Sequence, residues 1–355
     1  YAKQVDRLPK YEGDPSAFPR INLDETNTKS LIDTVRKKLQ AFPAWARYYK
    51  RVTTEISKKI DPVTADSILA GRSAGVLDSN YSVPGAYTID SYRVNMREAI
   101  DKATDELTKD DWVMGEKAEK AQAQGDDIKK IGDKYLNDYS DHWRKFIQSV
   151  NVVDYKNNKG VAIDALKAFS NAESPMKILL QEVSKQTNLS KEPENKGWID
   201  WIWSLFQKKK DPKSTPDTIV EKEFRPLFAF TDSGDKGDQS PISLYGADLK
   251  KVSDELETMS ADQIKTASQE LADPNSKSEF SKLMKNVEKG INTKTEVFQG
   301  TAAGKDIATL LKKPFTNLKS FFGADEETQI RTAWAEQILP KAKEAEKGFP
   351  FEDSG

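Results

Sequence analysis

The residue types that usually carry out catalysis or bind metal are scarce in this chain. Its 355 residues include no cysteine and a single histidine, His142. This excludes disulfides, thiolate zinc sites, cysteine nucleophiles and two-histidine metal sites, and a Ser-His-Asp triad could use only His142. The 57 acidic residues guarantee many chance pairs, so no carboxylate pair can be assigned to acid/base catalysis. We predict no catalytic residue, no metal and no cofactor, and a packing role for His142 with one ring nitrogen hydrogen-bonded.

A glycine-rich string at 300–306, GTAAGKD, resembles a phosphate-binding loop. That loop needs four residues between its glycines and a Ser or Thr after its lysine. Only three residues separate Gly300 from Gly304, and Asp306 stands where the hydroxyl that binds Mg²⁺ would be. We interpret the string as a glycine-rich break before a helix with apolar residues at 307, 310 and 311.

Three aspartates in the string TDSGDKGDQS suggest a calcium loop: Asp232, Asp235 and Asp238. An EF-hand loop needs ligands at alternating positions, glycine at the sixth and glutamate at the twelfth, and Ser243 is twelfth from Asp232. The spacing therefore favours a solvated loop between helices, and a weak surface Ca²⁺ site is the alternative.

The composition argues against nucleic acid as a partner. Fifty-five basic and 57 acidic residues leave a formal charge of −2, while 37% of the residues are hydrophobic and 32% are charged. A chain so rich in surface residues is typical of elongated helical proteins. No run of eighteen apolar residues is present, and the chain begins at Tyr1 without a signal-peptide pattern, so we expect a piece of a longer protein.

Apolar residues recur at helical spacing through most of the chain. The clearest stripe runs from Ile128 to Val150 in steps of three and four residues, about 35 Å of helix at ~1.5 Å per residue. A helix at 31–39 is expected to give way at Pro43 to a second helix, and glycines and prolines predict an extended or turning connection at 70–90. Helices resume near Asp90, with a break before Trp112, and another starts at Pro175.

The fold class predicted from this periodicity is all-α: multi-helical and elongated, with two helical subdomains and little or no sheet. Further helices are expected near 217–231, 242–258, 261–272, 277–289, 305–312 and 325–346, with breaks at Pro241, Pro274, Gly300 and Pro314. Polar stretches flank residues 198–206, so we divide the chain into a helical domain at 1–190, a linker at 191–216 and a second helical domain at 217–355.

The linker carries an unusual cluster of large apolar side chains. As a helix, 198–206 would spread them over an arc of about 200°, wider than the stripe of an ordinary surface helix, so something must cover it. We favour burial between the two halves, and the alternative is contact with a partner protein or with a membrane surface, which the lysines at 208–210 would suit. The candidate interaction residues are Trp198, Trp201, Ile202, Trp203 and Phe206.

Several short strings in the chain contain proline, glycine or aromatic residues. They are VPGAYT at 83–88 with Tyr92, DWVMG at 111–115, YLNDY at 135–139 with Trp143, SPM at 174–176 with Leu179, Leu180 and Thr187, FRPL at 224–227, and Trp334 with GFPF at 348–351. Proline and glycine within them predict turns and helix starts, so we interpret them as structural joints. In their order and spacing, these strings resemble the periplasmic region of the IcmF/TssM family of type VI secretion. The segment at 191–216 and the direct Gly348–Phe349 junction depart from the family pattern.

The resemblance implies a non-enzymatic, periplasmic part of an inner-membrane protein that forms pillars of a complex across the cell envelope. It implies other copies of the same protein as partners, together with an outer-membrane lipoprotein (TssJ), mainly through a C-terminal domain absent from this chain, and a second inner-membrane protein (TssL). Two alternatives from other classes are a periplasmic hydrolase or wall-modifying enzyme, and a peripheral membrane module anchored through Trp198–Lys210.

Overall fold

The structure is a computed structural model of the chain. It describes residues 30, 34, 43–73, 75–114, 121–155, 158–190, 218–232, 239–273, 275–323 and 334–348. The candidate interaction residues at 198–206, the aspartates at 235 and 238, most of the expected helix at 31–39 and the string at 349–351 lie outside these residues.

The chain up to residue 190 folds as helices joined by turns and two short strands. Helix α6 is the longest of the described helices, with 29 residues. The elements are α3 (Ala44–Lys59), α4 (Ala65–Leu69), β1 (Leu77–Ser79), the 3₁₀ turn η2 (Gly85–Tyr87), the π-helical turn η3 (Ser91–Met96), α5 (Arg97–Met114), α6 (Ala121–Ser149), β2 (Val150–Val152), α7 (Lys159–Ser170) and α8 (Pro175–Thr187).

From residue 218 onward, the described secondary-structure elements are all helices or helical turns. The elements are α10 (Ile219–Thr231), α11 (Pro241–Thr258), α12 (Ala261–Ala272), α13 (Glu279–Thr295), the 3₁₀ turn η5 (Glu296–Phe298), α14 (Ala302–Phe321), the π-helical turn η6 (Trp334–Ile338) and α16 (Leu339–Gly348). The all-α prediction is confirmed: within the described residues the sheet is limited to antiparallel β1 and β2, with Leu77 opposite Val152 and Ser79 opposite Val150.

Local sequence explains where several helices begin. The Thr218 hydroxyl accepts a hydrogen bond from the backbone amide of Glu221, and the Glu221 carboxylate accepts one from the backbone amide of Thr218. Together they form a capping box at the start of α10. Ser174 precedes Pro175 at the first position of α8, and Ser240 precedes Pro241 in α11. The predicted helix start at Pro175 and the predicted break at Pro241 are therefore confirmed.

Two predicted breaks are wrong. Helix α5 continues through Trp112, and α14 continues through Pro314. An internal proline removes one backbone donor and pushes away the carbonyl one turn earlier. In the same stretch of α14, buried tyrosine hydroxyls from outside the helix donate to two carbonyls: Tyr245 to that of Leu311 at 2.8 Å and Tyr155 to that of Pro314 at 3.0 Å.

The predicted stripe of α6 forms the centre of the core. Ile131, Tyr135, Tyr139, Trp143 and Phe146 are buried, as the spacing requires of one helix face. The helix ends at Ser149, one residue before Val150, which is the first residue of β2. The sequence had predicted this face without showing which elements would cover it.

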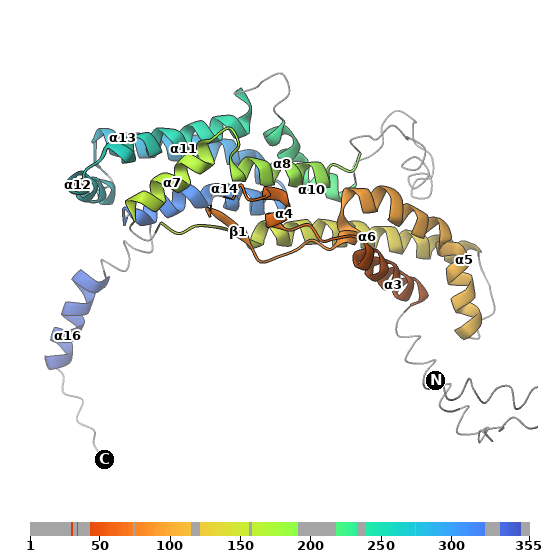
Figure 1. Ribbon diagram of the computed structural model, residues 1–355. Helices are drawn as coiled ribbons and strands as arrows, with labels where there is room; N and C mark the ends of the chain where they lie inside the picture. Colours follow the sequence, from red (N-terminus) through yellow and green to blue (C-terminus); the bar gives the residue numbers. More distant parts are fainter. Residues whose placement is uncertain are drawn as a thin grey trace, which may run out of the picture.

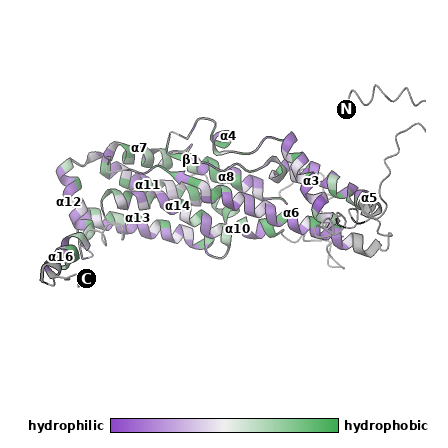
Figure 2. Cartoon of the chain, turned by 90° about the horizontal axis from the view of Figure 1, so that it is seen from below, coloured by the Kyte–Doolittle hydropathy of each residue, from purple (hydrophilic) through white to green (hydrophobic). Residues whose placement is uncertain are grey.

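Helices from both sides of 191–216 pack together around one core in an elongated body (Figure 1). Figure 2 shows α7, α11, α14 and α13 running side by side, with α6 and α10 continuing the body toward α3 and α5. Helix α7 packs on α11, α8 on α10, and α6 on both α10 and α14. The division into domains at 1–190 and 217–355 stays a prediction.

One carboxylate fixes both ends of the segment between these helices. The two carboxylate oxygens of Glu221 accept hydrogen bonds from the backbone amides of Ser190, at 2.6 Å, and Thr218, at 2.8 Å. The Glu221 side chain is buried, and a buried carboxylate needs such donors. The chain therefore leaves α8 and re-enters α10 at neighbouring points.

Candidate functional site

The string at 83–88 forms a tight joint against the end of α3. Val83 and Val63 exchange two backbone hydrogen bonds of 2.9 Å. A Cβ atom on Gly85 would lie 2.1 Å from the carbonyl oxygen of Ile60, so only glycine fits this close approach. The prediction that this string is a structural joint is confirmed.

Aromatic side chains of α6 hold the backbone of this joint. Tyr135 donates to the carbonyl of Ala86 at 2.8 Å, and the indole N–H of Trp143 donates to the carbonyl of Tyr87 at 2.9 Å. The ring of Tyr87 stacks on that of Tyr135 with centroids 5.6 Å apart. Because both donors are buried, each hydrogen bond satisfies a polar group that would otherwise destabilise the core.

Helix α8 completes the joint from the other side. The side-chain oxygen of Gln186 accepts the amide of Ile89 at 2.9 Å, and the Tyr139 hydroxyl donates to the Gln186 carbonyl at 2.7 Å. Met176, Leu179 and Leu180 of the same helix are buried in the core. Three strings that carried the family resemblance, at 83–88, 135–139 and 174–176, thus belong to one packed region.

His142 packs at the edge of this region. Its Nδ1 atom is hydrogen-bonded to the hydroxyl of Tyr81, and its ring stacks on Tyr87 with centroids 4.2 Å apart. Burial, together with the nearby Lys145 charge, lowers the pKa of His142, and burial raises the pKa of Tyr135 and Tyr139. The predicted packing role of His142 with one hydrogen-bonded ring nitrogen is confirmed.

The string at 300–306 caps a helix. The amide of Ala303 donates to the carboxylate of Glu223 at 3.0 Å, and the amide of Gly304 donates to the hydroxyl of Thr301 at 3.0 Å. The first turn of α14 therefore already holds a carboxylate from α10, where a phosphate loop would hold its ligand. The interpretation as a break before a helix is confirmed.

Asp306 in that string contacts the first half of the chain. Its two carboxylate oxygens accept hydrogen bonds of 3.0 Å from Arg144 and from Gln148, both on α6. Asp306 therefore ties α14 to α6. The predicted solvated loop after Asp232 stays a prediction, because Asp235 and Asp238 lie outside the described residues.

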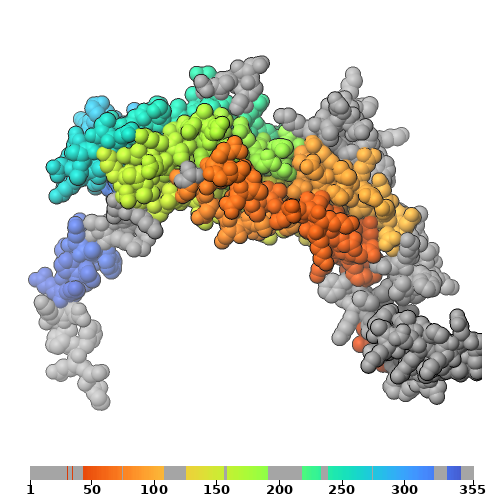
Figure 3. Space-filling view, viewed as in Figure 1, coloured from red at the N-terminus to blue at the C-terminus, as the bar shows by residue number. Residues whose placement is uncertain are grey.

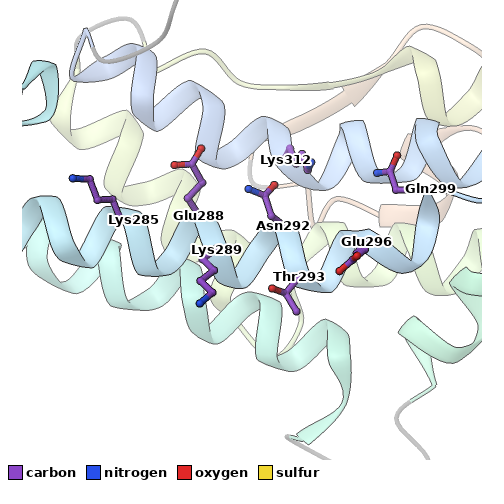
Figure 4. Close-up of a pocket in the computed structure, with 8 residues that line it drawn as sticks. All are labelled: Lys285, Glu288, Lys289, Asn292, Thr293, Glu296, Gln299 and Lys312. Carbon is purple, nitrogen blue, oxygen red and sulfur yellow. The ribbon is translucent and has the colours of Figure 1, made fainter. Parts of the chain in front are cut away.

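A groove of about 530 Å³ lies between α13 and α14 (Figure 4). Glu288 and Asn292 point toward α14, whereas Lys289 and Thr293 point away from it. The Lys319 ammonium lies 3.2 Å from a carboxylate oxygen of Glu288. The groove is lined by Lys285, Glu288, Lys289, Asn292, Thr293, Glu296, Gln299 and Lys312.

The two carboxylates of the groove are poorly placed for acid/base catalysis. Glu288 and Glu296 are eight residues apart, or about 12 Å at ~1.5 Å per residue along a helix. Paired carboxylates in glycoside hydrolysis lie about 5–9.5 Å apart. The exposed, charged lining suits surface recognition better than a reaction that needs exclusion of water.

The described ranges contain no group of three or more His, Cys, Asp or Glu side chains placed to hold a metal ion. No described helix combines the length and the apolar character needed to cross a bilayer. Sequence reasoning missed Glu221, Glu223 and Gln186. The signature Thr-x-x-Glu at 218–221 could have shown the capping box, but their tertiary contacts have no local signal.

Three comparisons relate this chain to known proteins. It is 27% identical over 183 residues to the type VI secretion system component TssM1 of Pseudomonas aeruginosa strain PAO1, a match covering 49% of this chain and 16% of that protein. Its fold is similar to a chain of a solved type VI secretion system membrane core complex, with a TM-score of 0.55 and 11% identity, covering 87% of this chain and 56% of that one. The chain therefore spans only part of both relatives.

A family model described as "IcmF-related: Intracellular multiplication and human macrophage-killing" matches residues 2–188, just over half of the chain. The strings at 83–88, 135–139 and 174–176, which build the joint, lie within this match. Beyond the match, α10, α11 and α14 pack on α6, α7 and α8 of the matched part. This chain belongs to the IcmF-related family.

Proposed function

We propose that this chain is a structural segment of a type VI secretion membrane core complex, acting as a periplasmic scaffold or pillar rather than as an enzyme. Family membership and the described role of the Pseudomonas aeruginosa relative support the assignment to type VI secretion. The fold it shares with a chain of a membrane core complex supports a structural role.

The observation that carries this proposal is the use of the buried polar side chains. Tyr135, Tyr139 and Trp143 all donate to backbone carbonyls of other elements, and Gln186 accepts a backbone amide. These hydrogen bonds fix the relative positions of helices, and they occupy the polar atoms of all four side chains in structural contacts. Such contacts give a rigid, uniquely packed body, which is what a mechanical element requires.

Family membership supports assembly with other components of the secretion system. We propose other copies of this protein, a TssL-like inner-membrane protein and a TssJ-like outer-membrane lipoprotein, the last mainly through a C-terminal domain outside this chain.

Two kinds of variant of the full-length protein separate the structural role from an enzymatic one. Replacing 43–323 by a flexible linker should abolish assembly and secretion, whereas Glu288→Gln and Glu296→Gln should leave both intact. Secretion that survives the deletion contradicts the scaffold role. An assembled complex that loses secretion with Glu288→Gln or Glu296→Gln would instead favour the hydrolase.

The periplasmic location has its own test. Because the chain has no cysteine, Leu244→Cys on α11 creates a single exposed labelling site. In a full-length protein whose other cysteines are replaced, a maleimide that cannot cross the inner membrane should label this site once the outer membrane is permeabilised. Labelling only after the inner membrane is lysed contradicts the periplasmic location.

A further inference from the structure

His142 is the side chain best placed to respond to acidity near neutral pH. It is the one histidine among the 355 residues, and the chain has no cysteine. The ordinary pKa of histidine is about 6.5, whereas carboxyl groups titrate near ~4 and tyrosine and lysine near ~10. A change in the stability of the fold between about pH 5 and about pH 7.5 is therefore expected to come chiefly from this ring.

The ring lies where the segment after β1 meets α6. Nδ1 of His142 is hydrogen-bonded to the hydroxyl of Tyr81, and the ring stacks on that of Tyr87 with centroids 4.2 Å and planes 28° apart. In Figure 3 the orange segment that carries α4 and β1 lies across the near face of the body, viewed as in Figure 1. His142 thus contacts the joint at 83–88 through Tyr87 and the stretch leading into it through Tyr81.

The two tyrosines are held in different ways. Tyr87 is buried, and its hydroxyl lies 2.9 Å from that of Tyr49 on α3. Tyr81 is only half-buried, and its hydroxyl on His142 is the hydrogen bond that joins it to another element within the described residues. Loss of that bond would therefore release the chain at 80–82 first.

The surroundings of the ring disfavour its charged form. Burial, together with the nearby Lys145 charge, lowers the pKa of His142, although two carboxylates on α6 act in the opposite direction. The face of the Tyr87 ring also attracts a cation, but by covering His142 it adds to the burial. Tyr81 and Tyr87 stay neutral here because burial raises their pKa. The charged groups that face the ring come from α6: Lys134, Asp138, Asp141 and Lys145.

We propose that His142 is a pH-sensitive switch that opens this joint in acid. At neutral pH the ring carries one proton, on Nε2, and accepts the Tyr81 hydroxyl at Nδ1. A second proton, taken up from solvent at Nδ1, makes both ring nitrogens donors and forces the Tyr81 O–H to turn round. The charge then lies half-buried beside Lys145, and it gains hydration when the ring swings away from Tyr81 and Tyr87. This switch does not depend on the proposed secretion role.

The direction of the pH effect follows from the lowered pKa of His142. A base whose pKa is lower in the folded chain than the unfolded value of about 6.5 binds fewer protons when the chain is folded. Its neutral form therefore contributes stability that is present above about pH 6.5 and is lost as pH falls to the folded pKa. Over this window the unfolding constant rises by about tenfold for each pKa unit of the difference.

A single histidine allows the proton to be followed directly. In the 355-residue chain isotopically labelled at histidine, NMR should show a His142 pKa below about 6.5 and, at neutral pH, a proton on Nε2. Urea unfolding should give an unfolding constant that is larger at about pH 5 than at about pH 7.5, by the fold-change that the measured pKa implies. A pKa at or above about 6.5, or a neutral ring protonated on Nδ1, overturns the proposal.

Variants separate this switch from a purely structural role of the ring. His142→Gln should remove the rise in the unfolding constant between about pH 7.5 and about pH 5, whereas Asp248→Asn, which removes a carboxyl with a lowered pKa, should keep it. Tyr81→Phe retains the ring without its hydrogen-bond donor, so the pKa of His142 should move up toward about 6.5 and the rise should shrink. A rise that persists unchanged in either His142→Gln or Tyr81→Phe overturns the proposal.

Hydrogen exchange measured by mass spectrometry locates the opening. After correction for the intrinsic effect of pH, peptides covering 80–88 should exchange about threefold or more faster at about pH 5 than at about pH 7.5, and this difference should vanish in His142→Gln. Peptides from α13, which lies toward the other end of the body, are the internal control. Equal changes in both regions, or no change at 80–88, contradict an opening of the joint.

Discussion

Adding one methyl group at Gly85 should strongly destabilise the protein. The Cβ of an alanine there would lie 2.1 Å from the carbonyl oxygen of Ile60 and 2.7 Å from the carbonyl carbon. Non-bonded atoms pack at about 3.5 Å or more, so the backbones must separate by about 1.4 Å. This shift would disturb the two hydrogen bonds of 2.9 Å between Val63 and Val83.

The magnitude follows from two contributions. Forcing an extra carbon into a packed site costs about 1–3 kcal/mol, and each weakened hydrogen bond costs about 1 kcal/mol. We expect Gly85→Ala to lower the free energy of unfolding by about 3 kcal/mol. At roughly 2–4 °C per kcal/mol, the melting temperature should fall by about 6–12 °C.

The matched control is the same substitution in a different place. Gly125 lies within α6, and a Cβ there would meet no atom within 4 Å. Alanine is favoured over glycine in a helix, so Gly125→Ala should raise the free energy of unfolding by about 0.5–1 kcal/mol. Urea unfolding followed by circular dichroism measures both variants. A Gly85→Ala variant within about 0.5 kcal/mol of the parent would refute the close packing of this joint.

Three further perturbations test separate features. Tyr245→Phe removes the hydroxyl that donates to the Leu311 carbonyl near Pro314, and urea unfolding should show a loss of about 1–1.5 kcal/mol. Burial opposes ionisation of Asp248, but hydrogen bonds from Lys251 and Lys294 outweigh it and hold its pKa below the usual value. A depressed folded-state pKa stabilises the fold above the unfolded value of about 3.9, and this contribution is lost as pH falls through the folded pKa. Asp248→Asn should therefore reduce the acid-induced fall in stability, and an unchanged pH profile contradicts the ion pair. If the segment at 198–206 is internal, Trp201→Ala should lower the melting temperature. An unchanged melt with lost liposome or partner binding contradicts its burial.

The sequence predicted the parts of this fold that depend on local spacing. Apolar residues every three or four positions identified the buried face of α6, and Ser-Pro and Thr-x-x-Glu patterns coincide with the starts of α8 and α10. These signals are local because helix hydrogen bonds and caps join residues three or four apart. Helix ends were predicted less well: α5 continues through Trp112, and α13 ends at Thr295 where the expected end was 289.

Contacts between distant residues had no comparable signal. Strands β1 and β2 have three residues each, too few to show alternation, and they pair across a long stretch of chain. Helix α14 is held near Pro314 by hydrogen bonds from Tyr155 and Tyr245, which are remote in sequence. Likewise, the carboxylate that caps α14 comes from Glu223 on another helix.

The position of α6 determines how the two halves of the chain are joined. It packs on α3, α5 and α8 of the first half and on α10 and α14 of the second. Glu221 also holds Ser190 and Thr218 next to each other at the ends of 191–217. The halves are therefore connected by packed side chains as well as by the covalent segment.

Cutting the chain within 191–216 should for this reason leave the body intact. We expect a protein cleaved at a protease site inserted there to elute from a sizing column as one species, with its helical circular dichroism retained. The cut lowers stability chiefly through the entropy gained by two free chain ends. This free-energy cost is small compared with the hydrophobic free energy of the apolar area buried between α7 and α11 and between α6 and α14. Fragments that separate after cleavage without denaturant would mean that 1–190 and 217–355 are independent domains, and that force passes between them through the linker alone.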